Sequence, residues 1–238
     1  MSSLKDKIVI ITGAVGNLGR AVAARVQAQG GKTVLVDRSS DRLREAYVDL
    51  KGSAQHWLAG DIDMTDAKAV SAMAAEAHKR FGRLDGLVNT VGGFRGGKPV
   101  HETDIAEWDF LYDINVRTTL NACRAVIPYM LQAQRGRIIT IASRNAFQGG
   151  ANYAAYSAAK TAVLRLSESM AGEYKARGIN VNCIVPGTID TPQNREAMPK
   201  ADFSTWVPPE DIANVIVFLL SDEARSVTGT AVPVYGRS

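Results

Sequence analysis

The chain has 238 residues, of which 46% are hydrophobic and 22% charged, a balance that excludes a disordered or fibrous protein and allows a sizeable buried core. Its 28 basic and 24 acidic residues leave a formal charge of +4, and the basic residues are scattered singly, which argues against a nucleic-acid-binding surface. The two cysteines and three histidines have none of the spacings typical of metal ligands, so we expect no metal site.

No Pro-, Ser- or Gly-rich linker and no block of like charges divides the sequence, so we expect one domain over residues 1–238. The apolar run at residues 8–11 is too short for the core of a signal peptide. The run at residues 214–220 is far shorter than the roughly 18 residues that cross a bilayer. We therefore expect a cytoplasmic protein that enters no membrane and binds no nucleic acid.

Short runs rich in β-branched residues alternate with helical periods along the chain. The runs predict strands at residues 7–12, 32–37, 54–59, 84–89, 136–142, 179–185 and 230–235. Apolar residues at helical spacing predict helices, most clearly at Val70, Met73, Ala74, Ala77 and Phe81 and at Ile212, Val215, Ile216, Leu219 and Leu220. Strands that are apolar throughout and separated by helices imply a parallel sheet covered on both faces. We therefore predict an α/β fold with a doubly wound, Rossmann-like parallel sheet of about seven strands.

The C-terminal half adds two expectations about the edges of this fold. Pro233 lacks an N–H for a ladder hydrogen bond, so the last strand should lie at a sheet edge or pair on only one side there. Long helices are predicted at about residues 116–134 and 152–177. The first carries two sets of apolar residues, Leu120, Cys123 and Ile127 beside Ala122, Val126 and Met130. One face would cover the sheet and a second face would meet another subunit, unless the helix is merely well covered within one chain.

A glycine-rich turn, Thr12-Gly13-Ala14-Val15-Gly16-Asn17-Leu18-Gly19, stands between the first predicted strand and a helix. Glycine lets the backbone approach a pyrophosphate closely, and the N-terminus of the next helix offers free N–H groups to the anion. Asp37 closes the second strand 18 residues after Gly19, where its carboxylate can accept hydrogen bonds from the adenosine ribose. This order predicts a dinucleotide cofactor. The charge of Asp37 would repel a 2′-phosphate and favours NAD, whereas the adjacent Arg38 leaves NADP open.

Several motifs fit one known pattern together. The turn matches TGxxxGxG at Thr12, Gly13 and Gly19, with Asn17 in place of the middle glycine. We expect Asn17 to keep the turn, because asparagine tolerates a positive φ. The residues Asn115, Ser143, Tyr156 and Lys160 match the asparagine, the serine and the YxxxK of the same pattern. The sequence resembles the short-chain dehydrogenase/reductase family over nearly its whole length.

This resemblance implies which residues contact the cofactor. They are Gly13, Asn17, Leu18, Gly19, Asp37, Arg38, Asp61, Ile62, Asn89, Gly92, Tyr156, Lys160, Pro186, Gly187, Thr188, Ile189 and Thr191. Asp61 and Ile62 resemble the pair that touches adenine, and the family's NNAG appears as Asn89-Thr90-Val91-Gly92, which matches only at its ends. Pro186 and Gly187 match the turn that lies against the nicotinamide. A substrate lid is expected at about residues 187–207, and the resemblance favours a homotetramer or a homodimer.

The four matching residues suit hydride chemistry. Hydride transfer to a ketone leaves an alkoxide that needs a proton, and the reverse reaction needs a base. Lys160 lies one helical turn after Tyr156 on the same face, where its ammonium, with the positive nicotinamide ring of the oxidised cofactor, would favour the phenolate and make Tyr156 the general acid/base. Ser143 would donate a hydrogen bond to the substrate oxygen. The resemblance assigns to Asn115 a water that links Lys160 to solvent.

A second pair with the same spacing, Tyr47 and Lys51, provides a contrast. It falls in the charged helix after Asp37, on the adenosine side of the sheet. Tyr156 instead follows the fifth strand, whose end carries Ser143. We therefore expect Tyr156 to be catalytic and Tyr47 to have no part in the reaction.

The sequence indicates the substrate less clearly than the cofactor. Candidates for substrate contact are Phe94, Arg95, Arg144 and Phe147, and the arginines, with Arg195 in the lid, would attract an anion unless they are merely solvated. The predicted function is the interconversion of a secondary alcohol and a ketone with NAD or NADP. Two alternatives stay open: an NADPH-dependent reductase of 3-oxoacyl thioesters, which Arg38 favours, and a dinucleotide-binding module without catalysis.

Overall fold

Seven strands form one sheet in the computed structural model, which describes residues 3–237. The strands are β1 (Ile8–Thr12), β2 (Lys32–Val36), β3 (His56–Ala59), β4 (Gly86–Asn89), β5 (Gly136–Ile141), β6 (Ile179–Pro186) and β7 (Ala231–Val234). All neighbours pair in parallel, in the order β3-β2-β1-β4-β5-β6-β7. The predicted doubly wound α/β fold is confirmed. The strand order reverses between β1 and β4, and the carboxyl ends of the strands at such a point form a ligand crevice.

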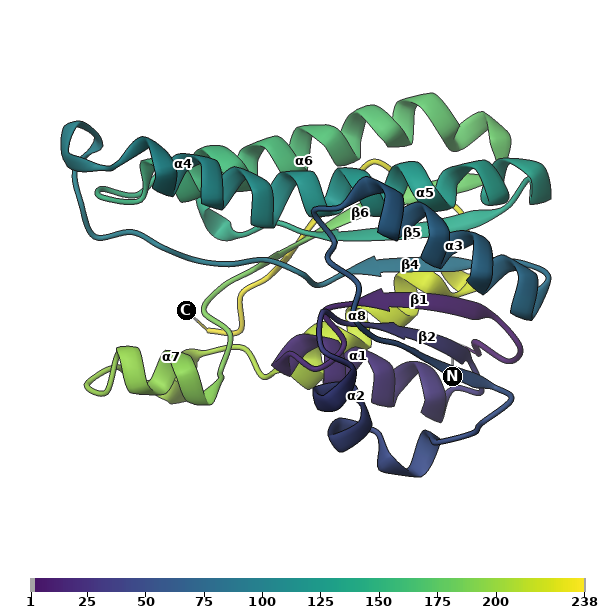
Figure 1. Ribbon diagram of the computed structural model, residues 1–238. Helices are drawn as coiled ribbons and strands as arrows, with labels where there is room; N and C mark the ends of the chain where they lie inside the picture. The colour runs from purple at the N-terminus through teal and green to yellow at the C-terminus, as the bar shows by residue number, and fades with distance from the viewer. Residues whose placement is uncertain (1–2, 238) are drawn as a thin grey trace.

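Helices cover both faces of the sheet, as Figure 1 shows. They are α1 (Asn17–Ala28), α2 (Ser40–Ala46), α3 (Ala67–Phe81), α4 (Ile105–Tyr112), α5 (Thr118–Ala133), α6 (Ala154–Tyr174), α7 (Pro192–Ala197) and α8 (Pro209–Leu220). α1, α2 and α8 pack on one face, and α3, α5 and α6 pack on the other. The central strands β1, β4 and β6 are buried along their whole length because helices cover both faces of the sheet there, whereas the edge strands β3 and β7 are mostly half-buried.

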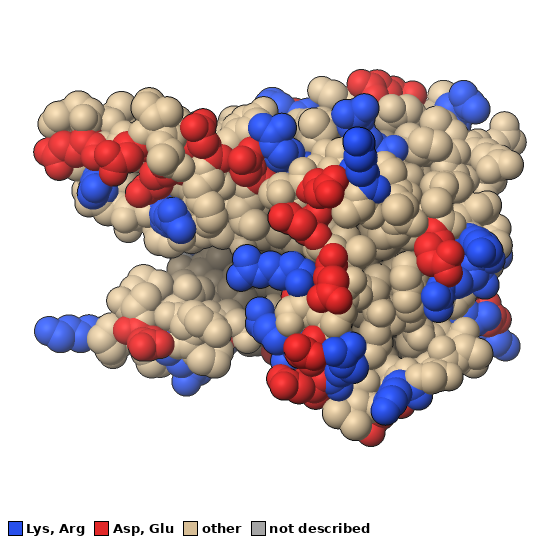
Figure 2. Space-filling model, viewed as in Figure 1, with Lys and Arg blue, Asp and Glu red and all other residues tan. Residues whose placement is uncertain are grey.

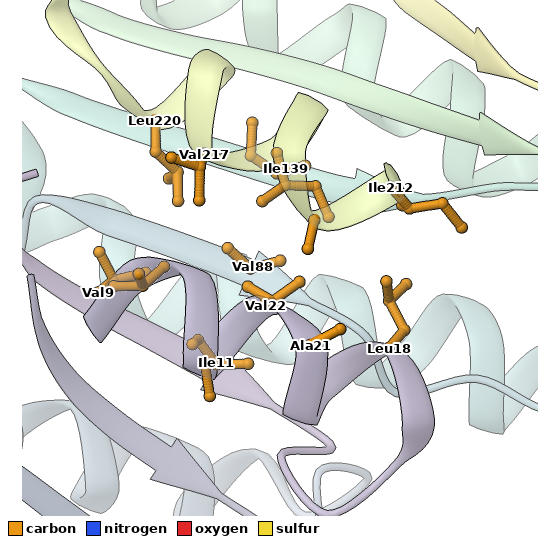
Figure 3. Close-up of a cluster of buried hydrophobic side chains, with 14 of the residues drawn as sticks. Val9, Ile11, Leu18, Ala21, Val22, Val88, Ile139, Ile212, Val217 and Leu220 are labelled. Atoms are coloured by element: carbon orange, nitrogen blue, oxygen red, sulfur yellow. The ribbon is translucent and has the colours of Figure 1, made fainter. Parts of the chain in front are cut away.

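Strand β1 shows how its alternate side chains fill the two layers. Ile8 and Ile10 join the buried cluster beneath α3 and α5, and Val9 and Ile11 join the cluster beneath α1 and α8. Figure 3 shows the second cluster, with Leu18, Ala21 and Val22 of α1 and Ile212, Val217 and Leu220 of α8. Each fully buried aliphatic side chain contributes roughly 1.5–3 kcal/mol. This packing fixes α1 and, with it, the glycine turn that precedes α1.

The helix expected at residues 152–177 begins at Ala154, as α6. Asn152 has φ 64°, a left-handed conformation that does not belong to a right-handed helix, so α6 starts after it. At its C-terminal end, a tight turn at Lys175–Arg177 leads to Gly178, which has φ 76°. The element was therefore predicted correctly, and its ends are set by two left-handed residues.

The helix expected at about residues 116–134 is the second part of a longer helical segment. The chain is already helical in α4, and one π-helical turn, Asp113–Arg117, joins α4 to α5. Asn115 lies in this turn and is buried. π-helical turns are rare and are found frequently at functional sites.

The two apolar sets on α5 are explained mostly within one chain. Ala122, Cys123, Val126, Ile127 and Met130 are all buried in the cluster that α5 shares with the sheet. Of the six residues, only Leu120 is exposed, with 36% of its surface accessible. The apolar pattern of this helix therefore carries little evidence for a subunit contact.

The last strand lies where Pro233 indicated. β7 pairs only with β6 and closes the sheet at one edge, with Pro233 opposite Val185. Within residues 3–237, no helix combines the length and the apolar character that crossing a membrane requires.

Candidate active site

The turn between β1 and α1 is shaped by glycines at its two ends. Gly13 has φ +65°, and a side chain at Gly19 would bring its Cβ to 2.2 Å from the Gly13 carbonyl oxygen. Only glycine fits at Gly19. α1 begins directly after Gly16, and no side chain caps its first N–H groups. The turn therefore offers backbone donors and the positive end of a helix to an anion.

Asn17 fits the turn for a reason other than the one we expected. It is the first residue of α1 and is not among the residues with positive φ, so its tolerance of that conformation is not used. Its side chain instead leaves the turn: Nδ2 donates a hydrogen bond to Oε1 of Gln193 in α7, at 2.8 Å. The neighbouring Leu18 points into the core, which leaves only its backbone for a ligand.

The segment after β4 supports the turn despite its departures from the family pattern. Oγ1 of Thr90 donates a hydrogen bond to the Thr12 carbonyl oxygen at 2.6 Å. A side chain at Gly13 would meet Thr90 and Val91 at 3.1 and 3.2 Å, so both residues pack directly against the turn. A threonine hydroxyl and a valine side chain thus hold the glycine turn here.

Asp37 and Tyr47 bind the same turn from its other side. Asp37 is 7% exposed, and its Oδ2 accepts a hydrogen bond from the Val15 N–H at 3.4 Å. The Tyr47 hydroxyl donates to the Ala14 carbonyl oxygen at 2.6 Å, and burial raises the pKa of Tyr47 to about 12. Tyr47 therefore has a structural partner, and its phenol stays protonated near neutral pH.

The predicted adenine contacts follow β3. Asp61 is exposed and has φ 59°, and its carboxylate accepts hydrogen bonds from the backbone and side chain of Ser40, at 3.1 and 2.5 Å. These bonds lower the pKa of Asp61. Ile62 is half-buried and packs against the core, and Arg38 beside Asp37 is exposed.

Two buried polar atoms at the ends of β1 and β4 lack a partner among residues 3–237. They are Oγ1 of Thr12 and Oδ1 of Asn89, and the Asn89 Nδ2 reaches only the sulfur of Cys123, at 3.6 Å. Buried polar groups almost always have partners, and both atoms stand where the strand order reverses. With the glycine turn and Asp37, they fit a bound dinucleotide.

Ser143, Tyr156 and Lys160 come together at the carboxyl end of β5. The Tyr156 hydroxyl is hydrogen-bonded to the side chain of Ser143. Lys160 Nζ donates to the Ile141 carbonyl oxygen at 3.0 Å and lies 5.9 Å from the centre of the Tyr156 ring. The predicted spacing on one face of α6 is therefore realised, next to a serine from the strand.

Burial shifts the ionisation of Tyr156 and Lys160. Burial raises the pKa of Tyr156, and the hydrogen bond from Ser143 only partly offsets this. Burial also lowers the pKa of Lys160 to about 8. The phenolate expected at Tyr156 depends on the positive nicotinamide ring as well as on Lys160, and the protein chain by itself leaves Tyr156 with a raised pKa. Near neutral pH, the site holds a phenol and an ammonium.

Asn115 is brought to the same place by the π-helical turn. Its Nδ2 donates to the carbonyl oxygens of Gly93 and Leu111 at 3.0 and 2.9 Å, and its Oδ1 accepts from the Gly93 N–H at 3.2 Å. A Cβ at Gly92 would lie 2.9 Å from Asn115 Oδ1 and 3.2 Å from Lys160 Nζ. Both polar atoms thus border Gly92, and Asn115 fixes the loop after β4.

The segment after β6 forms an excursion whose two ends meet. Gly187 N–H donates to the Val234 carbonyl oxygen at 3.0 Å, and Ile189 pairs with Val207. Thr191 Oγ1 accepts from the Asn194 N–H at 3.1 Å and caps α7. Residues 187–207 therefore project as one unit with α7 at its tip (Figure 1). Figure 2 shows a hollow between this unit and the part of the molecule formed by α4 and α6.

Of the candidate substrate residues, the two phenylalanines are exposed and the arginines stack on aromatic rings. Phe94 and Phe147 are 59% and 50% exposed. The guanidinium of Arg95 stacks on the Phe110 ring, that of Arg144 on Tyr235, and that of Arg195 on Phe203. Arg195 also binds Asp190 through two hydrogen bonds, of 2.6 and 2.7 Å.

The fold also brings two residues to this site, Tyr153 and Gln193, that were not among the predicted site residues. Tyr153 contacts Phe94 with ring centres 5.4 Å apart, and Gln193 binds Asn17. Tyr153 stands just before α6 with a backbone that is not helical, so helical spacing does not predict its place beside Phe94. Nothing in the sequence pairs Gln193 with Asn17, because 176 residues separate them.

Comparison with known proteins agrees with this geometry. Residues 7–202 match the short chain dehydrogenase family, and the chain belongs to that family of oxidoreductases. Levodione reductase of Leifsonia aquatica is 34% identical over 97% of this chain and 93% of its own. 2-(S)-hydroxypropyl-CoM dehydrogenase 3 of Xanthobacter autotrophicus is 33% identical over 98% of this chain and 96% of its own. The crystal structure of carveol dehydrogenase from Mycobacterium avium in complex with NAD has a TM-score of 0.90 at 25% identity, covering 99% of this chain and 98% of that one.

Proposed function

We propose that this protein interconverts a secondary alcohol and a ketone with NAD(H), and that Tyr156 is the general acid/base. The observation that carries the proposal is the hydrogen-bond contact between Tyr156 and Ser143, one helical turn from the ammonium of Lys160. A phenol beside a hydroxyl can hold a carbonyl oxygen between two donors. Bound nicotinamide dinucleotide would supply or accept the hydride.

The chain's own residues would handle the proton. In the reduction direction, the Tyr156 phenol donates its proton to the oxygen that becomes the alcohol, and its raised pKa keeps that proton available near neutral pH. Ser143 donates a hydrogen bond to the same oxygen and stabilises its developing negative charge. In the oxidation direction the proton returns to Tyr156. Lys160 would hold the nicotinamide ribose. Asn115 would bind the water that links Lys160 to solvent, because Asn115 Oδ1 and Lys160 Nζ both lie next to Gly92.

The cofactor would lie across the crevice between β1 and β4. The turn from Gly13 to Gly19 would receive the pyrophosphate, and Asp37 the hydroxyls of the adenosine ribose. Asp61 and Ile62 would border the adenine, Asn89 and Gly92 the nicotinamide side, and the segment from Pro186 to Thr191 the nicotinamide itself. Residues 187–207 would form the lid.

Asp37 favours NAD over NADP in this proposal. It is buried and fixed by Val15, so a negative charge stands where a 2′-phosphate would be placed. Hydrogen bonds from Thr65 lower the pKa of Asp63, and the charge of Arg38 contributes in the same direction. Arg38 thus lies close enough to the Asp63 carboxylate to interact with it electrostatically.

Replacing Tyr156 with phenylalanine tests the proposed chemistry. Tyr156→Phe should lower kcat by about 10²–10⁴-fold, because it removes the hydroxyl that carries the proton and leaves the ring in place, while the dissociation constant for NADH stays within about threefold. Tyr112→Phe, at an exposed tyrosine of α4, is the matched control and should retain full activity. Rates follow from nicotinamide absorbance with a panel of ketones and alcohols, and NADH binding from its fluorescence.

The same variant separates catalysis from a binding module. If the protein only senses the dinucleotide, the wild type and Tyr156→Phe would both bind NADH, and neither would turn over a ketone. Turnover by Tyr156→Phe at the wild-type rate would show that another group moves the proton. Size-exclusion chromatography with light scattering would test the homotetramer or homodimer that we propose for the assembly.

A further inference from the structure

Three aromatic rings meet at the mouth of the candidate active site. The ring of Phe94 lies 5.0 Å from that of Tyr156 at an angle of 84°, and 5.4 Å from that of Tyr153 at 60°. Phe94 is nevertheless 59% exposed and Tyr153 38% exposed. Phe94 therefore packs in edge-to-face fashion with the proposed acid/base and its neighbour, and it leaves more than half of its own surface uncovered beside the Tyr156 ring.

Phe94 is held in this place by its neighbours along the chain. Before it, the N–H and the carbonyl of Gly93 are both bound to the Asn115 side chain. After it, the Gly97 N–H donates to the Asn152 carbonyl oxygen at 2.9 Å. A side chain at Gly96 would come within 2.4 Å of the Tyr153 ring, so glycine allows the loop to lie on that ring. The ring of Phe94 is thus positioned by hydrogen bonds on both sides.

The cations near the site are already engaged by protein groups. Cζ of Arg95 lies 3.6 Å from the centre of the Phe110 ring, and that of Arg144 lies 4.4 Å from the centre of the Tyr235 ring. Arg195 is paired with Asp190. To bind an anionic substrate, Arg195 would have to leave Asp190, whereas a neutral ring would gain an aromatic wall beside Tyr156. Aromatic pairs prefer offset or edge-to-face arrangements and gain free energy beyond the area that they bury.

We infer that Phe94 determines substrate specificity, and that the substrate is an uncharged ketone or secondary alcohol whose reacting carbon lies in a ring or is attached directly to one. This inference rests on the proposed function, since it takes the Tyr156 hydroxyl as the point where the substrate oxygen binds. The carbon next to that oxygen then lies beside Phe94, and a ring at that carbon covers the exposed face. An open-chain 3-oxoacyl thioester has no ring there and carries anionic groups on its carrier.

A matched pair of ketones tests the inference. Acetophenone and 2-octanone have the same number of carbon atoms, and only the first carries a ring at the reacting carbon. With NADH, kcat/KM for acetophenone should exceed that for 2-octanone by about tenfold, mainly through KM. Acetoacetyl-CoA should be a poorer substrate than either. A preference for 2-octanone or for acetoacetyl-CoA would overturn the inference.

Variants of Phe94 separate the ring from mere apolar bulk. Phe94→Leu should remove the preference for acetophenone by raising its KM about tenfold while leaving 2-octanone within about twofold, and Phe94→Tyr should restore it. Phe218→Leu is the matched control, because Phe218 is an exposed phenylalanine on α8, on the other face of the sheet. An equal loss on both ketones in Phe94→Leu would assign the residue a general packing role and refute its role in specificity.

Binding measurements keep this inference distinct from the proposed chemistry. Saturation-transfer NMR on the NAD-loaded protein should show 1-phenylethanol bound to the wild type and to Tyr156→Phe, and less of it bound to Phe94→Leu. Turnover that survives Tyr156→Phe would defeat the proposed function alone. No binding of 1-phenylethanol to the wild-type protein, or equal binding to Phe94→Leu, would defeat the specificity inference even if Tyr156 proves to be catalytic.

Discussion

Asn17 and Gln193 join the glycine turn to the tip of the excursion after β6. The bond runs from the first residue of α1 to the second residue of α7 and measures 2.8 Å. Asn17 also lines a pocket of about 470 Å³, together with residues that include Arg20, Asp190 and Glu210. A direct hydrogen bond therefore holds α7, beside this pocket, to the turn that we assign to the pyrophosphate.

This bond predicts coupling between the proposed lid and the cofactor. Gln193→Ala and Asn17→Ala should each speed the dissociation of NADH by about threefold to tenfold, because a neutral hydrogen bond contributes about 0.5–1.5 kcal/mol. The double variant should lose no more than either single variant, since both remove the same bond. Stopped-flow fluorescence of NADH release measures all four rates. Additive effects would show that the two side chains act separately.

The carboxylate of Asp37 should determine the preference between NADH and NADPH. The wild type should use NADH with a kcat/KM at least about tenfold above that for NADPH, because the buried carboxylate opposes a 2′-phosphate. Asp37→Ser should reduce this ratio about tenfold, and Asp41→Ser on the exposed side of α2 should leave it unchanged. A wild-type preference for NADPH would refute the role assigned to Asp37.

The sequence predicted the fold well because burial repeats along the chain. The central strands are covered on both faces, so their runs are mostly apolar, and Pro233 indicated that β7 lies at an edge or pairs on only one side, as it does. Tyr156 and Lys160 were also predicted to share a face, because the spacing of four residues has one geometric meaning in a helix. These features depend on local order.

The features that the sequence did not indicate depend on tertiary contact. The π-helical turn around Asn115 follows from no residue pattern that we can name, and Asn17 adopts a helical conformation that its place in the motif did not suggest. The raised pKa of Tyr156 in the protein chain alone has no signal in the sequence, because it comes from burial in the folded chain. Spacing alone predicts proximity and gives no measure of desolvation.

Lys160 predicts how the stability of the protein depends on pH. Burial lowers its pKa in the folded state to about 8, from an ordinary value of about 10.5. Below pH 8, folded and unfolded chains both hold the proton, and the folded state bears the full cost of a buried charge. Between these two pKa values the unfolded chain binds more protons, so the contribution of Lys160 to the free energy of unfolding rises with pH.

Lys160→Met should remove this rise because methionine carries no charge. The free energy of unfolding of the variant minus that of the wild type should fall by about 3 kcal/mol between pH 7 and pH 10.5, whatever its absolute value. Urea unfolding at several pH values measures the difference, and Lys175→Met, at an exposed lysine after α6, corrects for the general effect of removing one lysine. A difference that stays constant over this range would show that the ammonium of Lys160 is as well solvated in the folded protein as in the unfolded chain. The same result would remove the reason for placing a desolvated cation beside Tyr156.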